Sequence, residues 1–459
     1  MKKRWIYPVL VIELLMPFFA LARQPVEPLH VGPRYPVKET APSPLPHVRP
    51  EFEDVNYWIG RLRDPDKVLM ETEEIEKVNR AALKNDPDSL DILSLPDEID
   101  TGILKRRLAR SWARYGGSRL YDSASRPLST VYLARLFTLT NIQGVPDHVI
   151  PLYGVVVHAT NLRVFPTDDL VMDRPFDYAF DRFQAGRLDV GTAVVILHYD
   201  VDCTWCFVDT GYAWGWVRPN DVAVGDKEQV IKFAGGKPLI VSGDSVSFYH
   251  DHDFGEYAFE LPMGAKLPLA ESVHGGYRVV MPCRDGYGRL FLTDGFVRAD
   301  ADVHEGYLPY TMGAVLRQAF KIKDGYYSWG GLNKGRDCSR FIMDVFRCFG
   351  FRMPRDSNRQ ALFCKRNRLE LEGISDGAKV EALMRIGQKP TILYMRGHVM
   401  LFLGVVDDRI YAVHSFWEYD DEHHGVVYHV GRTVVSDLTL GKGGKETLLG
   451  HLKAALPLD

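Results

Sequence analysis

The chain has 459 residues, of which 46% are hydrophobic and 25% are charged, an ordinary composition for a soluble globular protein. Its formal net charge of -4 gives no support to nucleic-acid binding, which favours a basic surface. The length suggests about three folded units rather than one.

Residues 1–22 have the pattern of a secretory signal peptide. Basic residues at 2–4 precede an apolar run, which ends in the small–x–small pattern at 20–22. The alternative is an uncleaved anchor, but Glu13 and Pro17 interrupt a stretch that would need about twenty apolar residues to span a membrane. We therefore expect export to the periplasm, the cell wall or the cell exterior, with no integral membrane segment after signal removal.

The remaining sequence divides into five segments. Residues 23–50 are rich in proline and predict an extended, disordered linker. Helical periodicity over 51–150 predicts a structural cap, with Asp64-Pro65 as the start of its first long helix. Period-two alternation between turns predicts two small β-barrels, at 151–225 and 226–303. Residues 304–459 turn from helical to strand-like patterns, so the fold class is α+β multidomain.

The six cysteines permit three disulfides in an exported protein, but their spacing is irregular. They lie at Cys203, Cys206, Cys283, Cys338, Cys348 and Cys364. The first two form a C-x-x-C motif among strand-like residues, where a redox pair is one alternative and incidental cysteines or a local disulfide are the other.

Cys338 stands where an amphipathic helix should begin. In "CSRFIMDVFRCFG" the apolar residues fall on one helical stripe, and Gly350 suits the helix end. Unpaired N–H groups and the positive end of the helix dipole favour an anion at such a position. We therefore expect a lowered pKa and a nucleophilic thiolate at Cys338.

A thiol nucleophile needs a base, and His398 and His414 lie on a predicted antiparallel hairpin, 390–419. With a turn near Asp407-Asp408, the two histidines are diagonal neighbours, with roughly 7–8 Å between their backbones. Both rings point to one face only if the loop has an odd number of residues or one strand carries a bulge. A plain two-residue loop would place them on opposite faces.

These residues resemble the NlpC-type cysteine peptidases of bacterial cell walls. The resemblance rests on Asp-Cys-Ser before the helix, Gly-His-Val opening a strand, "YYSWGG" and "PRDSNRQ", over about 326–417. It implies a papain-like fold with a Cys-His-His triad that cleaves wall stem peptides at the γ-D-glutamyl bond to the diamino acid. An N-terminal helical cap and two SH3-like barrels before the peptidase, with "TNLRVFPT" and "GWVRPNDVA" in the first, match a four-domain subgroup of this family.

The resemblance also implies roles for individual residues. Cys338 would be the nucleophile, His398 the base and His414 the residue that orients the base. Asp337 would contact the free amine of L-alanine, although a plain helix cap is the alternative. An aromatic residue of the first barrel would close one end of the groove. The full set of implied substrate contacts is Tyr327, Asp337, Ser339, Asp356, Ser357, Tyr212 and Trp214.

The hypothesis is an exported endopeptidase acting on stem peptides with a free N-terminal L-alanine, working as a monomer without a cofactor. An amidase or acyltransferase with the same Cys–His pair is one alternative, since the fold supports several reactions. A wall-binding protein with SH3-like barrels and an inactive C-terminal domain is another. The sequence offers no recognisable metal site, because the His423-His424 pair lacks further ligands at a suitable spacing.

Overall fold

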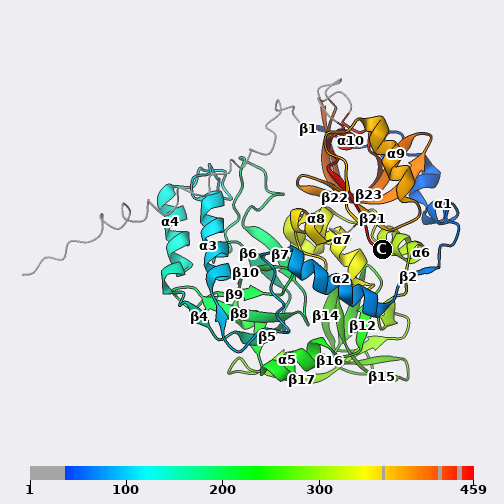
Figure 1. The fold of residues 1–459 in the computed structure, drawn as a ribbon. Coiled ribbons are helices and arrows are strands. Elements are labelled where there is room, and N and C mark those ends of the chain that lie inside the picture. Colours follow the sequence, from blue (N-terminus) through cyan, green and yellow to red (C-terminus); the bar gives the residue numbers. More distant parts are fainter. Residues whose placement is uncertain (1–36, 364–366, 422–425, 442–446) are drawn as a thin grey trace, which may run out of the picture.

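The computed structural model describes residues 37–363, 367–421, 426–441 and 447–459. The predicted signal peptide, Cys364 and the His423-His424 pair lie outside these residues. Three seven-stranded sheets dominate the part of the chain that is described. The helix that begins at Cys338 lies in the centre of the molecule, between the C-terminal sheet and the two other sheets (Figure 1).

The C-terminal sheet carries the two histidines. Its strand order is β1-β24-β23-β22-β21-β25-β20, and all neighbours except β1 and β24 are antiparallel. The strands are β1 (Val37–Thr40), β20 (Leu369–Glu370), β21 (Thr391–Met395), β22 (His398–Val406), β23 (Arg409–Asp421), β24 (Val426–Asp437) and β25 (Ala454–Pro457).

Helices cover both faces of this sheet. The larger apolar core joins it to the helices before and around Cys338, and a smaller core joins it to the late helices. The first group comprises α1 (Val55–Ile59), α6 (Met312–Lys321), α7 (Cys338–Arg347) and α8 (Ser357–Phe363). The second comprises α9 (Asp376–Ile386) and α10 (Leu448–His451). The strongly amphipathic α7 buries the stripe predicted from the sequence.

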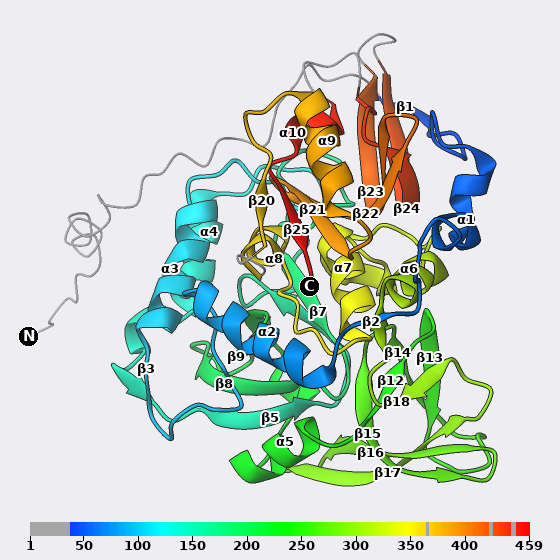
Figure 2. The same ribbon diagram turned by 45° about the vertical axis from the view of Figure 1, so that its right-hand side comes forward.

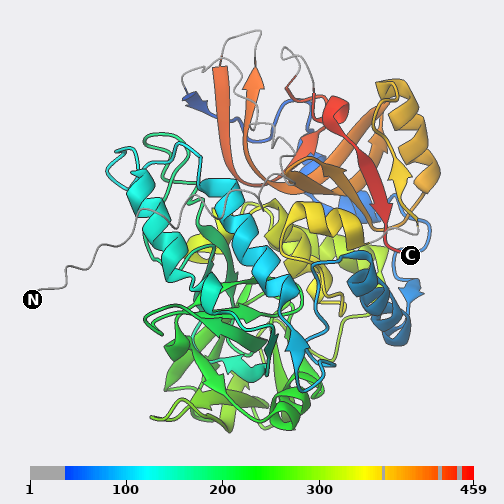
Figure 3. The same ribbon diagram turned by 60° about the vertical axis from the view of Figure 1, so that its left-hand side comes forward.

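The first barrel has the strand order β11-β5-β8-β9-β10-β6-β7. Its strands are β5 (Leu152–Val156), β6 (Thr160–Arg163), β7 (Gln184–Leu188), β8 (Ala193–Tyr199), β9 (Cys206–Asp209), β10 (Trp214–Val217) and β11 (Val222–Val224). Helices α3 (Gly102–Tyr115) and α4 (Thr130–Leu139) stand side by side next to it (Figure 3), and the short strands β3 (Ile99–Asp100) and β4 (His148–Val149) pair nearby.

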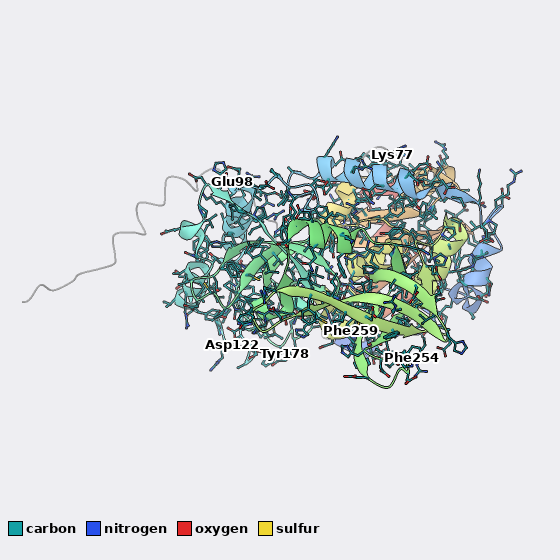
Figure 4. The ribbon with its side chains drawn as sticks, turned by 90° about the horizontal axis from the view of Figure 1, so that it is seen from below. Lys77, Glu98, Asp122, Tyr178, Phe254 and Phe259 are labelled. Atoms are coloured by element: carbon teal, nitrogen blue, oxygen red, sulfur yellow. The ribbon has the colours of Figure 1, made fainter. Side chains whose placement is uncertain are left out.

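The second barrel has the order β14-β13-β17-β16-β15-β12-β18. It begins after α5 (Lys227–Ala234) and contains β12 (Pro238–Val241), β13 (Ser245–Tyr249), β14 (Tyr257–Pro262), β15 (Lys266–Val273), β16 (Gly276–Arg284), β17 (Leu290–Arg298) and β18 (Val303–Glu305). Seen from below, Phe254 and Phe259 of this barrel lie along the same edge of the molecule as Tyr178 from the β6–β7 loop (Figure 4).

The proline-rich segment is not a disordered linker where the structure describes it. Strand β1 extends the C-terminal sheet beside β24, as Figure 2 shows. The residues that follow bury Ala41, Leu45 and Val48 in the core of that sheet. The prediction was wrong because it rested on composition alone. A strand that pairs in a sheet has its backbone N–H and C=O groups hydrogen-bonded even when its composition is typical of a linker.

Two further expectations need correction. The first long helix, α2 (Thr72–Asn85), starts after Glu71, which forms a capping box with Glu74, and not at Asp64-Pro65. The intervening β2 (Val68–Met70) pairs with β19 (Tyr310–Thr311) instead. The predicted two-stranded hairpin over 390–419 is three strands, because Gly397, at φ 81°, turns the chain between β21 and β22.

Aromatic packing from the N-terminal segment stabilises the C-terminal sheet. Trp58 is 2% exposed, donates its indole N–H to the Phe52 carbonyl oxygen at 2.8 Å, and packs near Tyr411 of β23. Replacing a buried aromatic residue with alanine removes apolar contacts and leaves a cavity. We expect Trp58→Ala to lower stability by about 3–5 kcal/mol, seen as a lower Tm in a thermal melt. Tyr287 is 88% exposed, so Tyr287→Ala should change Tm by only about a degree, as is usual for a surface substitution.

Candidate active site

Helix α7 begins at Cys338, as the sequence predicted, and its thiol is almost enclosed, with Cys338 only 6% exposed. The loop before it contains Gly330 and Gly331 at φ 65° and 74°, a backbone conformation that favours glycine. A side chain at Gly330 would also collide with Gln184 of the first barrel, whose Cγ lies 2.3 Å from the position of a Cβ there. Close packing against the barrel therefore accounts for Gly330 in the loop before Cys338.

A buried carboxylate fixes the start of α7. Asp337 Oδ1 accepts hydrogen bonds from the Arg340 amide at 2.8 Å, the Ser339 hydroxyl at 3.1 Å and Arg355 Nη1 at 3.0 Å. Its Oδ2 accepts from the Gly330 amide at 2.9 Å and Arg355 Nη2 at 2.7 Å. This one side chain therefore joins the glycine loop, the first turn of α7 and the loop before α8.

These bonds give Asp337 a structural role. A carboxylate offers about four lone-pair sites, and five donors contact the two oxygens of Asp337. Burial raises the pKa of Asp337, but the charge and hydrogen bonds of Arg355 outweigh it and hold the pKa below its usual value. Asp337 is thus the helix cap that the sequence offered as one alternative, and contact of Asp337 or Ser339 with a substrate stays a prediction.

A β-bulge places the two histidines on one face of the hairpin. The loop of β22 and β23 has only two residues, Asp407 and Asp408, both with positive φ. For each pair near the loop, the two residue numbers add up to an odd value. Beyond a register shift next to Gly404 they add up to an even value, which allows both histidines to point to the same face. The structure thus meets the predicted condition by the bulge and not by the loop length.

The two rings meet directly. His398 Nε2 lies 2.7 Å from His414 Nδ1, and His414 Nε2 lies 2.8 Å from the Ser436 hydroxyl oxygen. The Cys338 sulfur lies 4.0 Å from the carbonyl oxygen of Gly397, the residue before His398. If His398 donates from Nε2, its Nδ1 carries the free lone pair that a general base requires. Ser436 could not be identified from the sequence, since a lone serine late in a strand carries no motif.

Burial governs the protonation of the site. It raises the pKa of Cys338 to about 12, with a smaller contribution from the Asp337 charge, so the predicted lowering of the thiol pKa is not found. Burial also lowers the pKa of His398 to about 4 and holds that of His414 well below its usual value. The favourable helix terminus is outweighed because a thiolate in an enclosed site loses its hydration. Near pH 7 the thiol and both imidazoles are neutral.

Tyr327 lies in an aromatic cluster between the first barrel and the C-terminal sheet. Its ring centroid is 5.4 Å from that of Trp417 on β23 and 6.1 Å from that of Phe180 in the β6–β7 loop. Phe180 also packs 5.3 Å from Trp329, and Arg182 lies over the Trp329 ring. Burial raises the pKa of Tyr327, and the charges of Cys338 and Asp337 raise it further. We name Phe180, Tyr327, Trp329 and Trp417 the aromatic cluster.

The two aromatic residues predicted for the first barrel both contact arginines. The ring of Trp214 has Arg107 of α3 and Arg359 of α8 packed on it at 3.8 and 4.2 Å, and the ring of Tyr212 has Arg347 of α7 at 4.6 Å. Contact of either ring with a substrate stays a prediction. Sequence reasoning missed Phe180 because nothing in the loop after β6 marks which residue reaches the C-terminal sheet.

The remaining two expected contacts lie at the start of α8. Asp356 is exposed and its Oδ1 accepts a hydrogen bond from the Arg359 amide at 3.0 Å, so it acts as a helix cap. Ser357 is the first residue of α8 and is 8% exposed. Gln360, on the same helix, donates to the Ser339 carbonyl oxygen at 2.8 Å and so ties α8 to α7.

Metal ligands and disulfides do not feature in the described part of the chain. No cluster of three or more metal-ligating side chains occurs in residues 37–363, 367–421, 426–441 and 447–459. Five cysteines of those ranges are free thiols, so the local disulfide considered for Cys203 and Cys206 is not formed. In the same ranges no helix is long and apolar enough to cross a bilayer.

Comparisons with known proteins agree with this architecture. Residues 324–407 match the model of the NlpC/P60 family, and residues 173–218 match that of an SH3 domain of the SH3b1 type. Two parts of this α+β multidomain chain are therefore similar to an NlpC/P60 domain and to an SH3b domain. No curated protein matches the chain.

Solved structures extend the likeness to nearly the whole chain. An NlpC/P60 endopeptidase from Photobacterium damselae subsp. piscicida is 17% identical, with a TM-score of 0.70 over 92% of this chain and 98% of its own. An NlpC/P60 family protein from Bacillus cereus ATCC 10987 is 15% identical, with a TM-score of 0.44 over 66% of this chain and 98% of its own. At these identities the first match establishes a shared fold.

The lowered pKa of His398 gives a pH prediction for any reaction in which it is the base. A base works when neutral, and a pKa of about 4 keeps His398 neutral at higher pH. We expect kcat/KM to stay level from pH 7 down to about 5 and to fall about tenfold per unit below pH 4. Steady-state kinetics across this range, with circular dichroism as a folding control, checks this. A fall centred between pH 6 and 7 would contradict it.

The Asp337 network predicts the effect of losing its arginine. Arg355→Gln removes the charge that compensates a buried carboxylate, and breaking such a pair typically costs about 3–5 kcal/mol. We expect a lower Tm and a higher pKa for Asp337, so the loss of Tm relative to the parent protein should be larger at pH 7 than at pH 4. Arg385→Gln, at an exposed pair on α9, is the matched control and should not change Tm measurably.

Proposed function

We propose that this chain is an exported cysteine endopeptidase acting on peptidoglycan stem peptides. The bond would be the one between γ-linked D-glutamate and the L-diamino acid, and the preferred peptides would carry a free N-terminal L-alanine. The observation that carries the proposal is the arrangement of Cys338, His398 and His414. A thiol at a helix start adjoins a strand whose first residue is a histidine, and that ring is held by a second imidazole at 2.7 Å.

The chemistry would follow from this arrangement. His398 Nδ1 takes the proton of the Cys338 thiol as the sulfur attacks the γ-carbonyl carbon. Backbone N–H groups at the start of α7 stabilise the oxyanion of the tetrahedral intermediate. The imidazolium of His398 then protonates the leaving amine of the diamino acid, and water hydrolyses the thioester with His398 again as base. His414 and Ser436 keep the ring in the required tautomer throughout.

The neutral pair at rest is compatible with this sequence of steps. A thiol with a pKa of about 12 reacts only if its proton leaves as the carbon–sulfur bond forms. A bound peptide would displace water and bring its polarised carbonyl to the helix start, where the N–H groups meet the developing charge. The catalysis would therefore depend on positioning more than on a pre-formed thiolate.

The aromatic cluster supports a preference for short peptides. Phe180 belongs to the first barrel, yet its ring lies 5.1 Å from that of Trp417 on β23. Tyr327 links this contact to the surroundings of Cys338. A barrel loop placed there would close one end of a peptide groove and favour a substrate that ends at L-alanine over one that continues into a glycan strand.

Cleavage assays separate this proposal from its alternatives. We expect the protein to release the diamino acid from L-Ala-γ-D-Glu-diaminopimelate, as measured by mass spectrometry, and Cys338→Ala to release none. Acetylating the alanine amine should lower kcat/KM at least tenfold, on the order of the loss when one buried polar contact is left unmade.

The controls decide which alternative would replace it. Binding of the peptide without cleavage, equal for the parent and Cys338→Ala, would favour the wall-binding protein. Transfer of the acyl group to an added amine, in place of hydrolysis, would favour an acyltransferase. His198→Ala, at a histidine of the first barrel that hydrogen-bonds Thr140 and Asn141, serves as a control for the loss of a histidine in general.

A further inference from the structure

We propose that strand β7 of the first barrel is a positioning element for Cys338, with Asp189 acting through Arg340. The SH3b match covers this strand, and a barrel of this kind is ordinarily considered as a binding module. Here β7 lies against the loop before the nucleophile, and successive residues of the strand and its end reach three parts of the site. The inference rests on the proposed function only in taking Cys338 as the reactive thiol.

The first contact of β7 is with the glycine loop. Gln184 Nε2 donates to the Gly330 carbonyl oxygen at 3.3 Å and to the Gly186 carbonyl oxygen at 2.6 Å. Gln184 is 3% exposed, and its own carbonyl accepts from Arg163 at 3.0 Å, which fixes the amide's orientation. Because Gly330 has no Cβ, the loop can sit directly on this side chain.

The second contact is with Arg355, the partner of Asp337. A Cβ on Gly186 would lie 3.1 Å from Arg355 Nε and 3.3 Å from its Cγ, so the guanidinium stem passes directly over the β7 backbone. The Arg355 amide also donates to the Tyr212 carbonyl oxygen at 3.1 Å. The barrel thus contacts Arg355 at its backbone amide and along its side chain, and the Arg355 head group in turn binds the helix cap Asp337.

The third contact is with α7 itself. Arg340 lies in the first turn of this helix, two residues after Cys338. Its Nη1 donates to the Arg187 carbonyl oxygen at 3.2 Å and its Nη2 to Asp189 Oδ2 at 2.7 Å. Its Nε pairs with Asp344 of the same helix at 2.6 Å. The side chains of Arg340 and Asp189 are 5% and 7% exposed, so water does not screen the pair.

Through Arg340, Asp189 therefore affects the position of Cys338. The backbone N–H of Arg340 donates a hydrogen bond to Asp337, and the Arg340 side chain binds Asp189 of the barrel. This one residue therefore fixes the first helical turn through both its backbone and its side chain. Cys338 and the N–H groups proposed for the oxyanion are in that turn. A displacement of about 1 Å there can cost about a hundredfold in rate, which makes the anchor relevant to catalysis and not only to stability.

Asp189→Asn tests the proposal, with Asp209→Asn as its matched control. Both variants neutralise a buried aspartate of the same barrel, and Asp209 pairs with Arg107 of α3 at 2.6 Å, not with α7. The readout is the rate at which iodoacetamide alkylates Cys338 at pH 8, measured on the Cys338 peptide by mass spectrometry. Burial keeps this thiol protonated, so loosening the first turn should admit water and raise the rate.

We expect iodoacetamide to alkylate Cys338 at least threefold faster in Asp189→Asn than in the parent protein. In Asp209→Asn the rate should equal that of the parent, although both substitutions lower Tm. With the stem peptide, Asp189→Asn should lower kcat about tenfold and leave KM within about twofold, the pattern of lost positioning. Equal alkylation rates in the two variants would overturn the proposal. Should Asp189→Asn not fold, Gln184→Ala tests the same strand and should raise the rate in the same direction.

The alkylation rate does not depend on any substrate. If the parent protein leaves the stem peptide intact, the proposed function fails, while the comparison of the two variants still decides the role of β7. If the peptide is cleaved but Cys338 is alkylated at the same rate in Asp189→Asn and Asp209→Asn, the proposed function stands and the positioning role of β7 fails.

Discussion

The buried carboxylate of Asp337 is the constraint on which the rest of the site depends. It begins α7, closes the glycine loop and binds Arg355 with both oxygens. An ionised carboxylate is stable in such a place only when charge and hydrogen bonds compensate its lost hydration. The groups that supply this compensation therefore also fix the first turn of α7, and with it the position of Cys338.

The second constraint is the pairing of β22 with β23. Side chains alternate between faces along a strand, so a shift of one residue would move His414 away from His398. A two-residue loop alone produces that unwanted arrangement, and the bulge beside Gly404 corrects it. Trp58 lies 3.5 Å from where a Cβ on Gly404 would be. The N-terminal segment, which is far from the bulge in sequence, thus packs on the bulge that brings the two imidazoles together.

The sequence was informative where chemistry and local structure coincide. The start of α7 at Cys338, the two histidines on one hairpin and the condition on their register all follow from motifs and periodicity. Contacts between distant segments could not be predicted in this way. Phe180 lies in the β6–β7 loop and Asp189 directly after β7, and only the packing of the barrel against α7 and β23 reveals their contacts. The arginines that pack on the rings of Tyr212 and Trp214 likewise come from segments distant in sequence, and no motif predicts these contacts.

The protonation of Cys338 is consistent with a free thiol in a protein that, as we propose, is exported. The helix terminus favours a thiolate, whereas enclosure opposes it, and enclosure is the larger effect at a side chain 6% exposed. Oxidants and disulfides react with thiolates that they can reach. A protonated, enclosed thiol meets neither condition, and the described cysteines of the chain include no partner bonded to it. In the proposed mechanism, the same enclosure that removes the resting thiolate would protect Cys338 until a peptide occupies the site, so that substrate binding, and not a permanent pKa shift, would separate protection from reactivity.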